Sequence, residues 1–307
     1  MQRREYLKSI TLAGAFLATP TGFIIPDRSA GSFSYCLNTS TISGQKPGFM
    51  AYFDLAARAG YQGIEIWIRD LQSELEAGTS LNTIKKQVLD SGLRIENAIG
   101  FAPWMVNDAS RRKEGFDQMK QEMELLAHVG CTRVAAPAAG ITAGDELDLF
   151  EIGERYDQLI EVGRQTGVMP QLEFWGAHPK FYHLGQALMV AAVANNQDVR
   201  FLPDVYHLFR GGSGFEGLKM LDGSRIEIFH MNDYPDSIVR EKQTDADRVY
   251  PGDGVAPISQ ILTDLKNMGG TKVLSLELFN REYWQQDALK VAKTGLEKMK
   301  KAVKEIS

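Results

Sequence analysis

Short apolar runs and longer amphipathic segments alternate eight times along this chain of 307 residues. The runs typical of strands are FSYCLNTSTI (33–42), GIEIWI (63–68), RIENAIGF (94–101), RVAAPAA (133–139), MPQLEFW (169–175), VRFLPDV (199–205), IEIFHMN (226–232) and KVLSLELF (272–279). Helical patterns, with apolar residues three and four positions apart, cover 47–59, 72–91, 111–129, 146–166, 183–195, 213–222, 257–268 and 285–304. Eight strand–helix repeats without a linker predict a single (β/α)8 TIM barrel, an α/β fold, over residues 31–307.

A doubly wound open sheet is the alternative fold. It would need a glycine-rich phosphate-binding turn after the first strand, and LNTSTISGQKPG (37–48) contains no G-x-G-x-x-G. Glycines follow several helical patterns, as in DSGLR (90–94) and QTGVMP (165–170), where a left-handed glycine can end a helix before the next strand. The barrel is therefore the favoured interpretation. Its active site would lie at the C-terminal ends of the strands.

The first thirty residues resemble an export signal. Arg3 and Arg4 precede Tyr6-Leu7-Lys8, and a weakly apolar stretch interrupted by Pro20 follows. This order is typical of twin-arginine signals, although an N-terminal extension is the alternative. The stretch is too short and too interrupted for a stable membrane span. We predict a twin-arginine-type signal over residues 1–30 and a periplasmic location.

Charge and cysteine content exclude several classes of protein. The net charge is −5, and no run of Lys and Arg is long enough to follow a phosphate backbone, so nucleic acid is not an expected partner. Two cysteines, Cys36 and Cys131, cannot form a disulfide framework or a structural zinc site by themselves. We expect a small carbohydrate as the partner, and a homo-oligomer is compatible with the chain.

Four polar side chains stand near the ends of the last four strand runs. They are Glu173, Asp204, His230 and Glu277. Singly, each would more often be an ion-pair partner, but acidic residues inside apolar runs are costly to bury unless paired or metal-bound. Because strand ends of a barrel meet at one mouth, the four can converge. Three carboxylates and an imidazole suit one divalent ion, Mn²⁺, Mg²⁺, Co²⁺ or Zn²⁺.

Several motifs together resemble a known superfamily. They are QLEFWG with Glu173, PDVYHLFRGG with Asp204 and His207, FHMNDYP with His230, the loop DRVYPGDG (247–254), and LSLELFN with Glu277. In this order the chain is similar, over about residues 33 to 304, to the xylose-isomerase-like TIM barrels of the sugar (phosphate) isomerase/epimerase superfamily. The resemblance implies that Glu173, Asp204, His230 and Glu277 bind the metal and that Glu173 and Glu277 are the catalytic proton-transfer pair.

Further residues are candidates for substrate binding. His207 lies three residues after Asp204 and would bind substrate or support the ligands, or be a second metal ligand. Arg248 matches a family arginine that contacts substrate or orients a glutamate, with a solvated loop arginine as the alternative. His178, Glu65 and Trp67 are placed at the mouth, and Trp104, Phe101 and Trp175 could stack on a sugar or belong to the core.

The favoured function is a metal-dependent isomerase or epimerase of a keto-sugar or inositol-like substrate. The metal would stabilise an enediolate formed when a carboxylate removes the proton beside the carbonyl. A lyase or dehydratase, such as one that cleaves a 3-keto-glycoside or dehydrates an inosose, is the alternative. An apurinic endonuclease would need a histidine-rich, multi-zinc centre and a basic face, which five histidines and a negative charge disfavour. A non-catalytic sugar-binding barrel would not need opposed glutamates around a metal.

Overall fold

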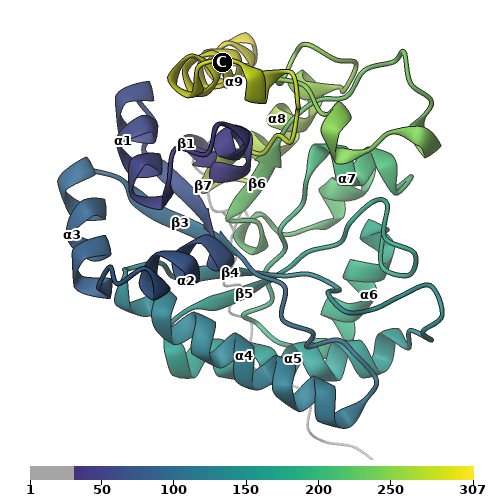
Figure 1. The fold of residues 1–307 in the computed structure, drawn as a ribbon. Helices are drawn as coiled ribbons and strands as arrows, with labels where there is room; N and C mark the ends of the chain where they lie inside the picture. Colours follow the sequence, from purple (N-terminus) through teal and green to yellow (C-terminus); the bar gives the residue numbers. More distant parts are fainter. Residues whose placement is uncertain (1–30) are drawn as a thin grey trace, which may run out of the picture.

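The chain folds into a barrel of parallel strands surrounded by helices (Figure 1). A computed structural model describes residues 31–307, and the predicted export segment, residues 1–30, lies outside the described residues. The labelled strands are β1 (Ser32–Asn38), β2 (Gly63–Trp67), β3 (Arg94–Ile99), β4 (Arg133–Ala136), β5 (Met169–Leu172), β6 (Ile228–Met231) and β7 (Thr271–Leu276).

Backbone pairing divides the strands into two parallel sheets. The larger has the order β3-β2-β1-β7-β6, and the smaller pairs β4 with β5. The first and last strands pair along their length, from Ser32 opposite Thr271 to Leu37 opposite Leu276. This pairing closes one side of the barrel, since it joins the two ends of the described chain. Among residues 31–307 no backbone ladder joins β3 to its neighbour β4.

The sixth of the eight predicted strands, at 199–205, is much shorter than the sequence predicts. It has no β label of its own, and the label β6 belongs to the strand that follows it in the chain. The predicted run 199–205 forms isolated bridges, in which Phe201 pairs with Leu172 and Ile226, and Asp204 pairs with His230. The strand ends early because the Asp204 side chain accepts a hydrogen bond from the His207 amide (2.7 Å) and caps α7 (Val205–Arg210). The α-helix predicted at 213–222 is therefore wrong, and a short 3-10 turn, η2 (Glu216–Met220), lies there.

The other predicted helices are present. They are α1 (Phe49–Ala59), α2 (Ile68–Glu76), α3 (Leu81–Ser91), α4 (Ala109–His128), α5 (Leu149–Thr166), α6 (Leu184–Ala194), α8 (Ile258–Asn267) and α9 (Ala288–Glu305). The remaining 3-10 turns are η1 (Thr39–Gln45), η3 (Gly223–Arg225), η4 (Arg240–Lys242), η5 (Asp245–Asp247) and η6 (Tyr283–Gln285). The helix predicted at 72–91 is two helices, because Ser80 starts a new one by capping the Thr83 amide. Gly92 and Gly167 end α3 and α5 in the left-handed conformation, as predicted.

Two apolar clusters hold the barrel together. The larger packs the outward faces of the strands against the helices, with α9 beside α1 and β1 (Figure 1). The smaller cluster takes one residue from strands all around the barrel, so its members can meet only in the interior: Cys36, Trp67, Ile99, Ala135, Leu202, Ile228 and Val273. Cys36 and Cys131 are buried free thiols. Within the described residues, none of the helices is long and apolar enough to cross a membrane.

Candidate active site

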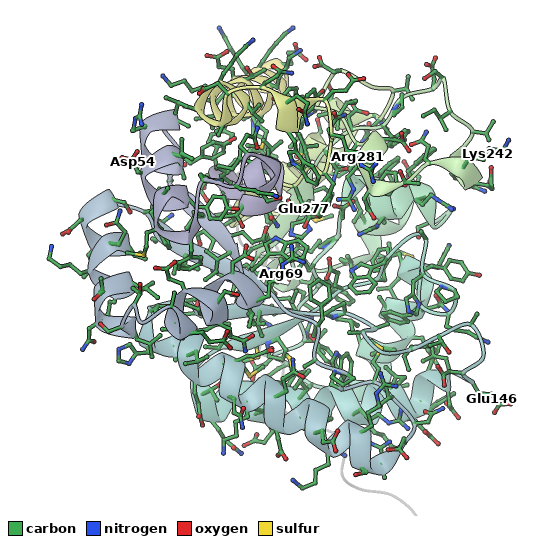
Figure 2. All side chains as sticks on the ribbon, in the orientation of Figure 1. Asp54, Arg69, Glu146, Lys242, Glu277 and Arg281 are labelled. Carbon is green, nitrogen blue, oxygen red and sulfur yellow. The ribbon has the colours of Figure 1, made fainter. Side chains whose placement is uncertain are left out.

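Above the inner apolar cluster, three of the predicted ligands converge. Asp204 follows the short sixth strand, His230 lies in β6, and Glu277 follows β7. One ligand atom from each lies within 4.8 Å of the others. His230 Nδ1 is 3.3 Å from Glu277 Oε2 and 3.7 Å from Asp204 Oδ2. All three side chains are buried, and Glu277 projects near the centre of the barrel (Figure 2).

The residues present fit a divalent metal ion. His230 Nδ1 and Glu173 Oε2 are buried without a hydrogen-bond partner of good geometry. Buried polar atoms of this kind are rare unless they bind an ion or water. Carboxylate oxygens and an imidazole nitrogen are a normal donor set for Mn²⁺, Co²⁺ or Zn²⁺. Asp204, His230 and Glu277 form the compact part of this set, and Glu173, which ends the β5 run, would complete it from one side.

The protonation of these groups reflects their mutual electrostatics. Burial raises the pKa of Glu173 to about 8; attraction by His230 opposes this shift, and repulsion by Glu277 and Asp204 adds to it. Burial alone would lower the pKa of His230, but the carboxylates of Glu277 and Glu65 outweigh it and raise that pKa well above its usual value. Crowded carboxyl groups at one cleft are typical of functional sites.

Arg248 is a buried cation beside the cluster. Its Nη1 donates to Asp204 Oδ2 (3.0 Å) and to Glu277 Oε2 (2.8 Å). Its Nη2 donates to Asp245 Oδ1 (2.5 Å) and lies 3.1 Å from His207 Nε2. Its guanidinium group is therefore held in one place by two of the candidate ligands and by the loop that carries it.

The loop that carries Arg248 is anchored by Asp233. This buried carboxylate accepts hydrogen bonds from the amides of Tyr234 and Ala256 on Oδ1 and of Gly252 and Gly254 on Oδ2, at 2.8–3.1 Å. Burial nevertheless outweighs these bonds and raises the pKa of Asp233. One side chain thus satisfies four backbone donors in a segment without regular structure.

A pocket of about 440 Å³ opens above the cluster. Its polar lining consists of Glu173, His178, His207, Asp245, Arg248 and Glu277. Its rim carries four aromatic side chains, Trp67, Phe101, Trp175 and Phe279. The rings follow one another at centroid distances of 5.4 Å (Trp67–Phe101), 5.8 Å (Phe101–Trp175) and 6.0 Å (Trp67–Phe279). We call these four residues the aromatic rim. The pocket therefore combines carboxylates with aromatic rings, a combination that suits sugars.

Comparison with known proteins places this geometry in a family. Residues 53–302, most of the chain, match the model of the xylose isomerase-like TIM barrel family. The chain belongs to this family. The resemblance inferred from the sequence motifs is therefore confirmed, as is the xylose isomerase-like α/β barrel.

Relatives of this xylose isomerase-like barrel include inosose isomerases. The inosose isomerase of Bacillus velezensis is 28% identical over 270 residues, which cover 85% of this chain and 94% of that protein. The inosose isomerase of Halalkalibacterium halodurans is 36% identical over 140 residues, 45% of this chain, so the chain spans about half (49%) of that relative. Among solved structures, that of the IOLI protein with a binding zinc atom has a TM-score of 0.81 and 26% identity, covering 89% of this chain and 99% of that one.

The family's barrel brings most of the predicted site residues together. Glu173, Glu277, His207, Arg248, His178 and Trp67 line the pocket, and Asp204 and His230 lie beneath it. Two predicted substrate contacts lie elsewhere. Trp104 is fully buried in the outer core, where its indole N–H donates to the Pro137 carbonyl (2.9 Å). Glu65 is fully buried below the pocket and faces His230 instead of the cavity.

Several polar residues in or near the site of this xylose isomerase-like barrel were not predicted from the sequence. Asn232 donates to Asp204 Oδ2 (2.8 Å), and Asp233 holds the loop of Arg248. Asn38, Asn97 and Ser275 surround Glu65 inside the barrel. For Asn38, Asn97 and Ser275 the signal in the sequence is a polar residue within an otherwise apolar strand, where burial is costly without a partner, whereas Asn232 and Asp233 directly follow β6.

Proposed function

We propose that this protein is a divalent-metal-dependent isomerase or epimerase that moves a proton beside the carbonyl of a keto-sugar or an inosose-like polyhydroxy ketone. The observation that carries the proposal is the pair of glutamates, Glu173 and Glu277, which line one pocket directly beside the Asp204–His230–Glu277 cluster. The inosose isomerase relatives and the zinc-binding IOLI structure support the same class of chemistry.

Asp204, His230, Glu277 and Glu173 would hold the metal. When bound, a divalent ion supplies a Lewis acid that polarises the substrate carbonyl. A bound ion would also supply positive charge to the buried carboxylates of the cluster, which otherwise repel one another. A match between buried negative charge and a bound cation is the usual reason that such groups remain ionised in a protein interior.

The chain's own residues would carry the proton. One of the two glutamates removes the proton from the carbon beside the carbonyl, and the electron pair of the broken C–H bond moves toward the carbonyl oxygen. The other glutamate donates a proton to form the new C–H bond, on the opposite face for an epimerisation. Arg248 keeps Glu277 oriented through its 2.8 Å hydrogen bond. The aromatic rim would pack against the C–H face of the ring and exclude water.

The test is solvent deuterium exchange. The full chain, loaded with Mn²⁺, Co²⁺ or Zn²⁺, is incubated in D₂O with a panel of ketoses, inososes and 3-keto-glycosides. We expect deuterium to enter one carbon of a panel member, and Glu173→Gln and Glu277→Gln each to slow this exchange by about 10²–10⁴-fold. Glu122→Gln is the matched control, since Glu122 is also buried but lies on α4 and pairs with Gln118.

The products decide between the isomerase and the lyase. An epimer or aldose–ketose isomer with deuterium at the exchanged carbon supports the proposal. Loss of water or of an aglycone after the same exchange would assign the lyase alternative. Absence of exchange with every metal and every panel member, or unchanged exchange in both glutamine variants, would refute proton transfer by these glutamates.

A further inference from the structure

Glu65 is a buried carboxylate for which the pocket chemistry gives no role. It lies in β2, has no exposed surface, and does not line the pocket. A carboxylate in such a place is costly unless its oxygens are fully satisfied. The residues around Glu65 must therefore supply hydrogen-bond donors to both of its oxygens.

The carboxylate of Glu65 accepts four hydrogen bonds. Its Oε2 accepts from Ser275 Oγ (2.6 Å) and Asn38 Nδ2 (2.8 Å), and its Oε1 accepts from Asn97 Nδ2 (2.7 Å). The fourth partner is His230 Nε2, 3.0 Å from Oε1. These partners come from β1, β3, β6 and β7, so the plane of the carboxylate is fixed from four sides. Only an acceptor with four lone-pair sites can serve four donors in this way, and a carboxylate is that acceptor.

The orientation of the Asn38 amide is also fixed. Its Oδ1 accepts from the amide of Ser40 (2.9 Å) and from the indole of Trp67 (3.0 Å), so its NH₂ group must face the carboxylates. That NH₂ group reaches both Glu65 Oε2 (2.8 Å) and Glu277 Oε1 (3.0 Å). Asn38 therefore connects the buried carboxylate to one of the pocket glutamates.

The two nitrogens of His230 face different groups. Nε2 points to Glu65, and Nδ1 points to Asp204 Oδ2 and Glu277 Oε2. With Glu65 ionised, the hydrogen bond to Oε1 places a proton on Nε2. In the neutral ring, the lone pair of Nδ1 is then directed at the ligand cluster. Carboxylates that orient a metal-binding histidine through its second nitrogen raise metal affinity in this way.

We propose that Glu65 is a positioning residue that fixes the ring and the tautomer of His230, so that Nδ1 is the atom presented to the divalent ion. The inference rests on the metal site of the proposed function. It adds to the four proposed ligands a fifth residue, Glu65, which does not touch substrate and is connected through Asn38 to Glu277.

The substitution Glu65→Gln tests the charge of this side chain separately from its shape. Glu65→Gln keeps the size of the side chain but turns one oxygen into an NH₂ group, which must then face two of the four donors. If the NH₂ group faces His230, Nε2 must accept and the proton moves to Nδ1, where it competes with the metal. If it faces Asn38 and Ser275, the carbonyl opposite His230 is neutral and a weaker acceptor. Both arrangements predict weaker metal binding.

The experiment titrates Zn²⁺ into the full chain against a chelating indicator. We expect Glu65→Gln to weaken Zn²⁺ binding about 10–100-fold and the buried control Glu122→Gln to leave it unchanged. Equal Zn²⁺ affinity in wild type and Glu65→Gln would overturn the role of Glu65 while leaving the proposed function intact. A wild-type protein that binds no divalent ion would remove both proposals together.

Nitrogen NMR of the Zn²⁺-loaded protein supplies a readout that a merely structural role would not move. We expect a protonated Nε2 and a zinc-bound Nδ1 for His230 in the wild type, and a shifted or lost Nε2–H signal in Glu65→Gln. A zinc-bound Nε2 in the wild type would overturn the proposal. Should Glu65→Gln fail to fold, Glu65→Asp keeps the charge but retracts the carboxylate by one methylene. Folded Glu65→Asp with undiminished Zn²⁺ affinity would also overturn it.

Discussion

Arg248 forms ion pairs with more than one buried carboxylate of the site. It is 1% exposed and contacts both Asp204 and Glu277 at hydrogen-bond distance. Burial alone would lower its pKa, but these carboxylates and Asp245 outweigh burial and raise it. The guanidinium therefore compensates carboxylates that would otherwise repel one another when no metal is bound.

Replacing this cation should matter most in the metal-free protein. For Arg248→Gln we expect a loss of about 3–5 kcal/mol in the free energy of unfolding in EDTA, since breaking a buried ion pair leaves uncompensated charge. With saturating Zn²⁺ the loss should be smaller, because the ion supplies positive charge to the same oxygens. Urea unfolding with and without the metal measures both values.

A surface arginine provides the control for Arg248. Arg164 is partly exposed and pairs with Asp198 and Glu161. We expect Arg164→Gln to cost at most about 1 kcal/mol under both conditions. An Arg248→Gln variant that is destabilised equally with and without Zn²⁺ would contradict the idea that Arg248 and the metal compensate the same charges.

At the level of single residues, sequence could predict which strand ends meet at the candidate site. Each of Asp204, His230 and Glu277 is a polar residue near the end of an apolar run, and the barrel brings those ends together. The depth of each side chain within the barrel could not be predicted from the sequence. A register shift at Ile64/Glu65 pairs Glu65 with Asn97, and single-sequence patterns carry no signal for such a bulge.

At the level of elements, the loop after β6 is positioned by one aspartate. Gly254 approaches Asp233 so closely that an added Cβ would lie 2.4 Å from Oδ1, so the segment 250–256 wraps tightly around the carboxylate. Because Arg248 lies two residues before this segment, a change in the position of the loop is expected to shift Arg248 and its contacts in the site.

Loosening this anchor should disturb the site without unfolding the barrel. For Asp233→Asn we expect the amides of Gly252, Gly254 and Ala256 to exchange with solvent faster, because an amide oxygen replaces one charged acceptor and an NH₂ group opposes the other donors. We also expect substrate deuterium exchange to slow, since Arg248 no longer holds Glu277 firmly. Hydrogen exchange by mass spectrometry and the D₂O assay measure the two effects.

The N-cap of α4 offers a control for Asp233. Asp108 accepts from the Arg111 amide (2.7 Å), and it lies outside the pocket. Asp108→Ala should cost about 1 kcal/mol of stability and leave both the loop amides and substrate exchange unchanged. Faster exchange of the loop in this control would mean that the loop responds to global stability and not to its own anchor.

Element type was predicted well except in the sixth strand–helix unit. There the apolar run 199–205 continues past the point where the backbone leaves the sheet, because Asp204 acts both as a strand-end residue and as a helix cap. Apolar periodicity does not distinguish these two uses. The predicted helix was consequently displaced by several residues, although the position of Asp204 at the mouth was unaffected.

At the scale of the whole molecule, side chains bridge the places where backbone ladders are missing. Arg133 in β4 contacts Glu96 of β3 and Glu227, and Arg200 donates to Glu227 Oε1 (2.8 Å). These ion pairs lie at the start of the strands, at the opposite end from the pocket. They connect β3 with β4, between which the described residues have no backbone ladder, and also with the sixth strand.

The network gives a defined pH dependence of stability. Burial alone would raise the pKa of Glu227, but hydrogen bonds and attraction from Arg133 and Arg200 outweigh it and lower that pKa below 4.5. A lowered pKa in the folded state stabilises the protein above the unfolded pKa, and this stability is lost as pH falls through the folded value. We expect Glu227→Gln to cost about 1–2 kcal/mol at pH 7 and progressively less below pH 4.5.

Urea unfolding at several pH values measures this difference. Asp54→Asn is the control, because Asp54 lies at the periphery on α1 (Figure 2) and pairs with exposed Arg58. Its effect should be small throughout. A Glu227→Gln deficit that persists unchanged into acid would show that the carboxylate contributes through packing and not through its charge.

The aromatic rim also equips the protein with an optical probe. The protein has four tryptophans. Trp67 and Trp175 line the pocket, whereas Trp104 is buried in the core and Trp284 donates to the Ser40 carbonyl. Half of the indole rings are thus in a position to meet a bound ligand, and the other half serve as an internal reference. Occupancy of the pocket should consequently change the intrinsic fluorescence of the unlabelled protein, so that ligands can be ranked by emission before any product has been identified.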